Sequence, residues 1–282
     1  LVSSGAIGSG VKCMGLKSRP QDIPGKQACA AVGQPLLMAN YSKAFAKYGI
    51  GVAQILLTQE DMSERKRYGN AANTFKVLLN SGIVPIVNEN DTIAVEEIKF
   101  GDNDMLSALV AMLVEADLLI ILSDIDGLYD GDVKKGKLIA CVEKITAQIE
   151  KLARGAGSKV GTGGMASKLK AVKKLSKAGI PVVIANGTRD GVIKNIAEGK
   201  QEGTLFIPDK SCLSNRKRWI GLTLTPKGKI IVDDGAKAAV CNRGKSLLPS
   251  GVLRVEGAFA AGDSVSIMDN AGCEFARGLV NF

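Results

Sequence analysis

Four short apolar runs, separated by amphipathic helical stretches, restrict the folds that this chain can adopt. The runs are rich in Val, Ile and Leu, are apolar on both faces and cover residues 52–57, 83–87, 118–122 and 181–185. Helical patterns accompany them at residues 27–47, 63–81, 105–116 and 165–178. Buried strands that alternate with helices are typical of βαβ crossovers. The sequence therefore predicts an α/β fold with a mostly parallel sheet that helices cover on both sides.

The pattern changes at about residue 221. Short strand candidates at residues 230–232, 253–255 and 264–268 follow one another with Gly-containing turns between them and no long helical pattern. This spacing predicts a first domain at residues 1–208, a linker at 209–220 and a small, mainly β domain at 221–282. Leu1-Val2 and residues 278–282 both read as parts of strands, so we expect each domain to be incomplete at its outer end.

Composition removes several classes of function. The 282 residues include no histidine, and the six cysteines show no C-x-x-C spacing, so a zinc site and a Ser/His/Asp hydrolase are both excluded. Any chemistry must use Asp, Glu, Lys or backbone amides. The apolar runs are too short to cross a bilayer and no signal peptide is recognised, so we expect a cytoplasmic protein without a membrane partner.

Positive charge is concentrated near the end of the chain. The net charge is +9, and residues 210–282 hold 11 Lys and Arg against 6 Asp and Glu. An RNA-binding module and a solvated, solubilising surface explain this asymmetry equally well. Trp219, which follows three cations at residues 216–218, could stack on a base or anchor the junction between the domains.

Polar residues follow the ends of two predicted strands, where ligands bind in open parallel sheets. Residues 3–10 are small, and they predict either a turn whose amides cradle an anion or an ordinary tight turn. Residues 88–91 follow the predicted strand at 83–87, residues 101–104 lead into the predicted helix at 105–116, and both segments carry Asn and Asp side chains. One of them is expected to cap that helix, and together they form an acceptor-rich cluster suited to an ammonium group or to lysines. A calcium loop is excluded because the EF-hand pattern is missing.

The other two junctions suggest a nucleotide. Residues 123–129 favour a polar rim for a nucleotide or a simple turn. Residues 155–168 bring glycines and hydroxyls directly into a helix N-terminus, which is an anion site but not a Walker A loop. Lys168 lies in the first helical turn, where its ammonium can reach a bound phosphate. The alternative is a solvated face, because four more lysines share the helix: Lys170, Lys173, Lys174 and Lys177.

Taken in order, these motifs resemble the bacterial glutamate 5-kinase family. Residues 235–263 resemble the PUA domain that many of its members carry. The resemblance implies the amino acid kinase fold, a three-layer αβα sandwich with a mostly parallel sheet, joined to a mainly β PUA-like domain. It also implies phosphorylation of the γ-carboxylate of L-glutamate with ATP and Mg²⁺, the first step of proline synthesis, with feedback inhibition by proline and a dimer or tetramer.

The resemblance also assigns roles to individual residues. Its catalytic positions are Lys168, which stabilises the transferring phosphoryl group, and Asp104, which orients the lysines. Substrate binding falls on Ser4, Gly5, Ala6, Asp91, Asp102 and Asn103. ATP binding falls on Ser123, Asp124, Thr162, Gly163, Gly164, Met165, Ala166, Ser167 and Lys168. Metal ligands are not assigned, and the family's Lys-x-Gly-Ser/Thr-like motif at the first strand is not in these residues.

The chemistry of glutamate is compatible with a chain that has no histidine. A glutamate carboxylate has a pKa of about 4.3, so at pH 7 it is ionised and attacks phosphorus without a general base. Phosphoryl transfer then needs positioning and charge neutralisation, which lysines, loop amides and a metal supply. The alternatives are an acetylglutamate, aspartate or nucleotide-monophosphate kinase of the same fold, and an RNA-binding protein that acts through the PUA-like domain.

Overall fold

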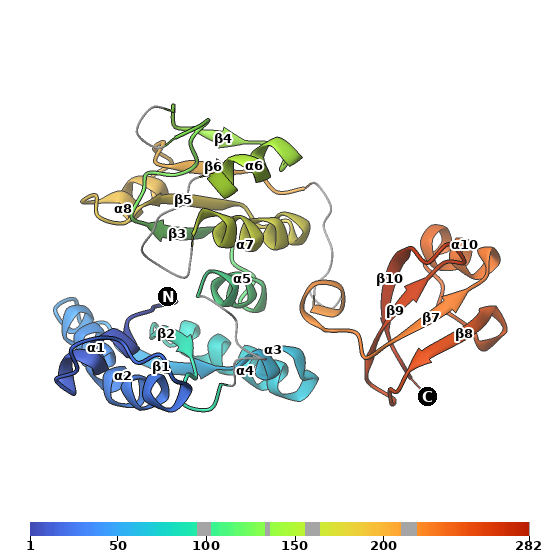
Figure 1. Cartoon of the computed structure of the whole chain (residues 1–282), viewed down its shortest axis with the longest axis horizontal. Coiled ribbons are helices and arrows are strands. Elements are labelled where there is room, and N and C mark those ends of the chain that lie inside the picture. Colours follow the sequence, from blue (N-terminus) through green and yellow to red (C-terminus); the bar gives the residue numbers. More distant parts are fainter. Residues whose placement is uncertain (95–102, 133–135, 156–163, 210–218, 282) are drawn as a thin grey trace. The chain divides into compact units, whose positions relative to one another are not determined.

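The computed structural model describes residues 1–94, 103–132, 136–155, 164–209 and 219–281. The chain divides into two compact units, Leu1–Cys212 and Leu213–Phe282, which are described separately (Figure 1). Most of the linker predicted at residues 209–220 lies outside the described residues.

A pair of parallel strands forms one part of the first unit. Strand β1 (Val52–Leu57) pairs with β2 (Val84–Glu89), from Val52 opposite Val84 to Leu57 opposite Glu89. Val2 forms a parallel bridge to Val87, in agreement with a strand at the start of the chain. The helix predicted at residues 63–81 is confirmed as α4 (Arg65–Asn80), and a short helix that was not predicted, α3 (Gln59–Ser63), precedes it between these strands. Thr58 and Asp61 form a capping box that starts α3, and Glu64 is extended between the helices.

A four-stranded sheet forms the other part of this unit. Its order is β3 (Leu119–Ser123), β5 (Val182–Asn186), β6 (Thr204–Phe206) and β4 (Cys141–Val142). β3 and β5 are parallel, as are β4 and β6, whereas β6 runs antiparallel to β5. The helices of this part are α6 (Ala147–Gly155), α7 (Met165–Ala178) and α8 (Val192–Ala197). The pattern of apolar runs missed β4 and β6 because they are only two and three residues long.

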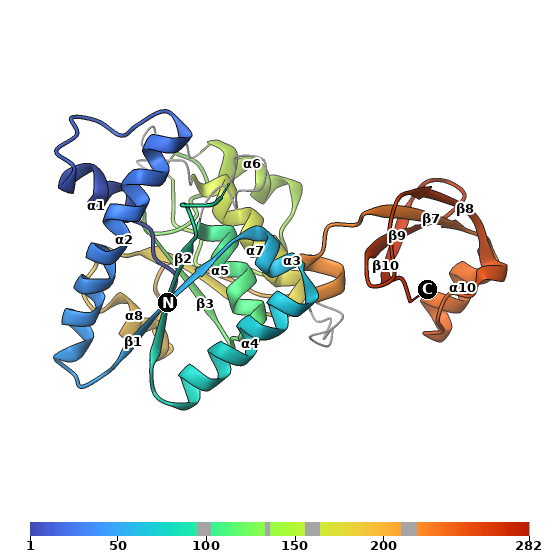
Figure 2. The same cartoon turned by 90° about the horizontal axis from the view of Figure 1, so that it is seen from below.

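Helix α5 (Asn103–Leu113) lies between the two sheets. Every residue from Leu106 to Leu113 is buried, and the helix contacts β2, β3 and α7 (Figure 2). A helix that is apolar on all sides in this way belongs in a core. Its first residues, Asn103 and Asp104, are therefore held in place by the packing of the rest of the helix.

The turn predicted at residues 3–10 is wrong, because a helix begins at Ala6. Helix α1 (Ala6–Cys13) packs against α2 (Ile23–Ala46), which starts earlier than predicted because Asp22 caps it. A Cβ atom at Gly10 would overlap the carbonyl oxygen of Cys29, and one at Gly33 would overlap that of Ala6. These glycines thus serve close contact between two helices rather than a turn.

The described part of the second unit, residues 219–281, holds a four-stranded sheet and a helix of ten residues. Its strands are β7 (Gly228–Val232), β8 (Val252–Gly257), β9 (Ser264–Met268) and β10 (Glu274–Leu279), in the order β10-β9-β7-β8. Helix α10 (Asp234–Arg243) was not predicted. It is capped by Asp233, whose carboxylate accepts from the Ala236 N–H at 2.6 Å, and it ends at Gly244 in a left-handed conformation. Short helical turns occur at Trp219–Thr223 and Pro249–Gly251. Among the described residues of the whole chain, no helix is long and apolar enough to cross a membrane.

Candidate active site

Neutral hydrogen-bonding groups meet at the start of α5. The Asn103 amide donates to Ser4 Oγ at 2.8 Å and to Asn88 Oδ1 at 3.1 Å. Ser4 follows the segment that pairs with β2, and Asn88 is near the carboxyl end of β2 itself. The structure therefore brings together two of the predicted substrate residues, Ser4 and Asn103, from positions 99 residues apart.

The segment around Ser4 is held by its neighbours. Ser3 is buried, its Oγ lies 2.7 Å from the Tyr41 hydroxyl, and its N–H donates to the Val87 carbonyl at 2.9 Å. Gly5 has φ 115°, a conformation that L side chains rarely adopt, and it leads directly into α1 at the buried Ala6. Ser4, by contrast, is exposed and available to a ligand.

The two acidic residues predicted to bind substrate are placed unequally. Asp91 lies two residues beyond the end of β2, in a turn that the Asn90 N–H ties to the Leu57 carbonyl at 3.0 Å. It is partly buried. Asp102 lies outside the described residues.

An ion pair occupies the other side of α5. Lys168 Nζ lies 3.0 Å from Asp104 Oδ2, and the Ser167 hydroxyl donates to the same oxygen at 3.3 Å. The Lys168 and Asp104 side chains are only 10% and 14% exposed. Lys170 and Lys177 on the same helix are exposed, and Lys173 and Lys174 are partly buried. Lys168 is thus distinct from the solvated lysine face that was its alternative interpretation.

The N-terminus of α7 supplies further predicted nucleotide residues. Gly164 is the cap in an extended conformation, and its carbonyl accepts from the Ser167 N–H at 2.9 Å. Met165 is buried, whereas Ala166 is exposed beside a hollow of about 120 Å³ between α6 and α7. Thr162 and Gly163 lie outside the described residues.

The predicted nucleotide residues Ser123 and Asp124 lie in a turn that a second carboxylate fixes. Ser123 Oγ donates to Asp124 Oδ1 at 3.2 Å. Two residues on, Asp126 accepts from the Asn186 amide at 3.0 Å and pairs with Arg189 at 2.8 Å. The Asn186 amide lowers the pKa of Asp126 below its ordinary value, and the Tyr129 hydroxyl and Arg189 add to this effect against the opposing effect of burial. The turn after β3 is therefore tied to the end of β5.

Comparison with known proteins assigns the chain to a family. Residues 1–186 match the amino acid kinase family and residues 228–282 match the PUA domain. Over 285 residues, the chain is 50% identical to the glutamate 5-kinase of Pelobacter propionicus, 52% to that of Caldanaerobacter subterraneus subsp. tengcongensis and 51% to that of Geobacter sulfurreducens. These alignments cover 100% of this chain and 76%, 77% and 76% of the three relatives. The chain belongs to the glutamate 5-kinase family.

Membership of the glutamate 5-kinase family confirms the predicted resemblance and the predicted fold class. An α/β unit with the amino acid kinase match and a mainly β unit with the PUA match follow one another along the chain. The roles of individual residues stay predictions. The structure also connects to the site several residues to which no motif assigned a role: Gln34, Tyr41, Asn88, Asp126, Asn186 and Arg189. Asn88 and Asp126 lie inside quoted motifs, but nothing in the sequence marks Gln34 or Tyr41.

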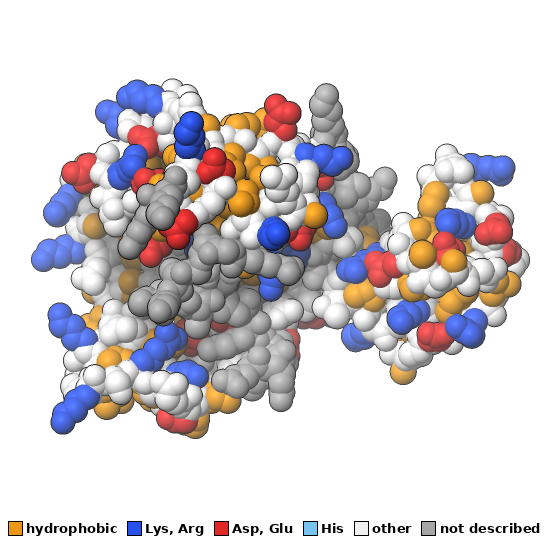
Figure 3. All heavy atoms as spheres, turned by 45° about the horizontal axis from the view of Figure 1, so that its top comes forward, with side chains coloured by type: hydrophobic (Ala, Val, Ile, Leu, Met, Phe, Trp, Pro, Cys, Tyr) orange, Lys and Arg blue, Asp and Glu red, His pale blue; other side chains and the backbone are white. Residues whose placement is uncertain are grey.

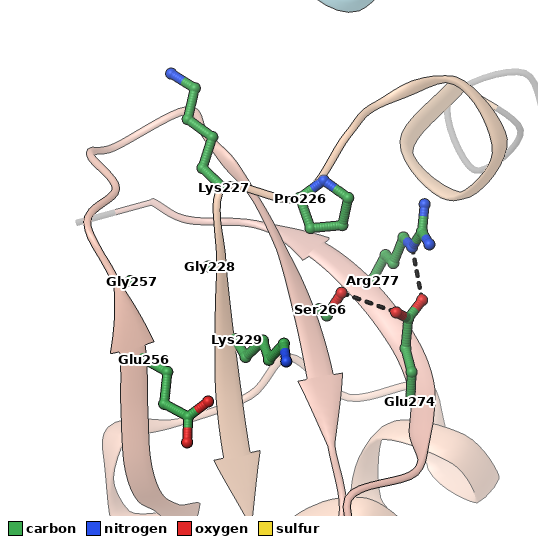
Figure 4. A pocket seen from close by; sticks show the side chains of 9 residues that line it. All are labelled: Pro226, Lys227, Gly228, Lys229, Glu256, Gly257, Ser266, Glu274 and Arg277. Carbon is green, nitrogen blue, oxygen red and sulfur yellow. Dashed lines mark hydrogen bonds and ion pairs between the residues drawn. The ribbon is translucent and has the colours of Figure 1, made fainter.

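A groove of about 420 Å³ on the C-terminal unit has mixed charge. Lys227, Lys229 and Arg277 line it together with Glu256 and Glu274 (Figure 4). Glu274 accepts from the Ser266 hydroxyl at 2.8 Å and pairs with Arg277 at 2.6 Å. Three further cations of this unit are paired with carboxylates: Lys227 with Asp263, Lys237 with Asp269 and Arg254 with Glu256. On the face seen in Figure 3, positive and negative side chains are intermixed on this unit, which does not favour a polyanion.

Proposed function

We propose that this chain transfers the γ-phosphoryl group of ATP to the γ-carboxylate of L-glutamate. A carboxylate oxygen attacks the γ-phosphorus, a new C–O–P linkage forms, and the bond from phosphorus to the bridging oxygen breaks, so that ADP leaves with its electron pair. The product is an acyl phosphate, L-glutamyl 5-phosphate, the first intermediate of proline synthesis. No proton has to be removed from the attacking group at pH 7, which suits a chain without histidine.

One observation carries this proposal: two adjacent residues of α5 serve two kinds of chemistry. Asn103 joins the neutral group of Ser4 and Asn88, whereas Asp104 joins Lys168 and Ser167. An amino acid substrate needs hydrogen-bonding groups that orient it, and a transferring phosphoryl group needs positive charge. Both requirements meet here within one turn of one helix.

The residues take roles that follow from their chemistry. Ser4 and Asn103 bind and orient glutamate, with the backbone of Gly5 and Ala6 beside them. Asp91 and Asp102 supply acceptor oxygens for its ammonium group. Lys168 stabilises the charge on the phosphoryl oxygens, and Asp104 holds its ammonium in place at 3.0 Å.

Nucleotide binding is proposed for the edge formed by β3 and α7. Ser123 and Asp124 line one side, and Gly164 with the first turn of α7 provides amides for the phosphates. Thr162 and Gly163, which come directly before Gly164 in the sequence, belong to the same proposed site. The described residues contain no group of three acidic or sulfur ligands that would hold a metal by themselves. This fits Mg²⁺ that is bound mainly by ATP phosphates, where it neutralises their charge.

Three further properties belong to the same proposal. Proline, which carries an ammonium and a carboxylate like glutamate, competes for the acceptor groups at Asp91 and at residues 102–104 and inhibits the enzyme. The active form is a homodimer or homotetramer. The protein works in the cytoplasm, where ATP and glutamate are both available.

The test is a product assay with the purified protein, expressed with whatever residues its gene encodes before Leu1. Incubation with ATP, Mg²⁺, glutamate and hydroxylamine should yield the γ-hydroxamate, because hydroxylamine traps acyl phosphates. Acetylglutamate and aspartate, whose acyl phosphates hydroxylamine also traps, serve as matched controls in place of glutamate. UMP, whose product would be a phosphoanhydride that gives no hydroxamate, is tested in the same mixture by the formation of ADP. Turnover of one of these in preference to glutamate would overturn the assignment of the substrate.

A second assay addresses RNA. Glutamate and ATP should raise the Tm of the protein, since ligands that bind only the folded state stabilise it. RNA should not be retained at physiological ionic strength. Salt-dependent retention of RNA with no shift in Tm from ATP or glutamate would favour the RNA-binding alternative.

A further inference from the structure

Helix α2 supports the candidate glutamate site although none of its residues is among the proposed ligands. Gln34, near the middle of this helix, is only 7% exposed. It accepts a hydrogen bond from the Asn88 amide at 3.0 Å and donates one to Gln54 Oε1 at 3.1 Å. Asn88 is 4% exposed and accepts in turn from Asn103. A chain of four amides therefore runs from β1 through α2 and β2 to the start of α5.

One backbone group fixes the donor-to-acceptor direction of these four hydrogen-bonded amides. The Glu89 N–H, which can only donate, points at Asn88 Oδ1 at 2.9 Å. Asn88 must therefore present its NH₂ group to Gln34, and Gln34 must present its own NH₂ group to Gln54. By the same logic Asn103 turns its NH₂ group toward Asn88 and Ser4, which leaves its Oδ1 as an acceptor for the substrate.

The same face of α2 reaches the segment that carries Ser4. Tyr41 is seven residues, or two helical turns, after Gln34, so both side chains project from one face. The Tyr41 hydroxyl lies 2.7 Å from Ser3 Oγ. Between them, Leu37 lies beneath Gly5, where a Cβ atom would be 3.8 Å from Leu37 Cδ1.

We infer that Gln34 and Tyr41 are positioning residues that orient the glutamate site from behind. Gln34 acts through Asn88 and sets which face of the Asn103 amide meets the substrate, and Tyr41 acts through Ser3 on Ser4. This inference rests on the proposed function, because the roles of Ser4 and Asn103 toward glutamate belong to that proposal. The consequence is that glutamate affinity depends on a helix that does not touch glutamate.

The principal test is Gln34→Met, which keeps the length of the side chain and removes both hydrogen bonds. The KM for glutamate should rise about tenfold, as expected when a buried hydrogen bond is lost, while kcat and the KM for ATP stay near their original values. Asn40→Met introduces the same side chain at an exposed position of the same helix and should leave all three parameters unchanged. Tyr41→Phe should raise the KM for glutamate alone, by a smaller factor.

A second pair of variants tests the donor-to-acceptor direction of the four amides and leaves the buried Gln34 unchanged. Gln54 is exposed and acts only as an acceptor for Gln34. Gln54→Glu preserves the acceptor and should retain the original KM for glutamate, whereas Gln54→Met removes it and should raise this KM. This pair decides the question if Gln34→Met does not fold.

The outcomes separate the two proposals. An unmodified protein that makes no hydroxamate from glutamate contradicts the proposed function. Normal turnover of glutamate by the unmodified protein, together with an unchanged KM in Gln34→Met and Gln54→Met, contradicts only the role given to α2. Equal increases in the KM values for glutamate and ATP would show a general structural effect and would also overturn it.

Discussion

The two sides of α5 differ in the kind of side chain that surrounds the helix N-terminus. Toward β1 and β2, Asn103 is held by neutral amides and a hydroxyl, and Gln34 and Asn88 each donate one hydrogen bond and accept another. Toward β3 and β5, the site is built from charges, with Lys168 on Asp104 and Arg189 on Asp126. An amide has a donor end and an acceptor end, so it fixes the orientation of a bound group. A charged side chain attracts opposite charge over a longer distance and can neutralise it. In the proposed function, orientation of the substrate and stabilisation of charge therefore fall to separate halves of one site.

The largest effect should come from the charged side. Lys168→Ala is expected to lower kcat about 100-fold or more, the usual loss when a preorganised charge-stabilising donor is removed, with little change in the KM for glutamate. Lys170→Ala, an exposed lysine on the same helix, is the control and should behave like the unmodified protein. Steady-state kinetics and a Tm measurement check both. Near-normal turnover by folded Lys168→Ala would show that Lys168 does not stabilise the transferring phosphoryl group, and the proposed difference between the two sides of α5 would be wrong.

The neutral side should respond in the other kinetic parameter. Asn103→Ala is expected to raise the KM for glutamate about tenfold, since one partly buried hydrogen-bonding group is lost, with a smaller effect on kcat. Asn103→Asp is a sharper test because its carboxylate would face Asn88 Oδ1, so that two acceptors oppose each other. Its KM for glutamate should be at least as high as that of Asn103→Ala. A loss confined to kcat in these variants would mean that Asn103 acts on the phosphoryl group instead.

A smaller effect is expected from the tie between β3 and β5. Asp126→Asn should raise the KM for ATP modestly and lower the Tm at pH 7 by about 2–4 °C. Because the pKa of Asp126 is depressed in the folded state, its contribution to stability is present above the unfolded value of about 3.9 and is lost as the pH falls through the folded value. The Tm difference between Asp126→Asn and the unmodified protein should therefore shrink as the pH is lowered from 7 to 3. The exposed Asp190→Asn is the control, and a difference independent of pH would refute this account.

The smallest effect should follow removal of residues 221–282. All residues with proposed chemical roles precede Gly187, so kcat and both KM values should stay close to those of the whole protein. Kinetics with proline titrated into both proteins would show whether the C-terminal unit alters inhibition. Loss of nearly all activity in a truncated protein that stays folded would mean that the β-rich unit completes the site.

The sequence predicted those features that depend on local pattern. Apolar runs located β1, β2, β3 and β5 to within two residues, and the helix at Met165–Ala178 was predicted with its actual bounds. Gly10 misled the prediction because a glycine that permits contact between helices looks the same in sequence as one that permits a turn. The burial of Lys168 could not be predicted either, since it depends on Asp104, 64 residues away. Gln34 is an ordinary helical residue until the fold places Asn88 against it.

Because Asn103 and Asp104 are consecutive residues of one buried helix, neither can move without the other. A ligand that draws Asn103 toward it also displaces the carboxylate that holds Lys168, and the reverse is equally true. Thermodynamic linkage makes such an effect mutual: any factor by which the amino acid changes the dissociation constant of the nucleotide must equal the factor by which the nucleotide changes that of the amino acid. In the proposed function, the end of α5 thus couples the two binding equilibria to each other.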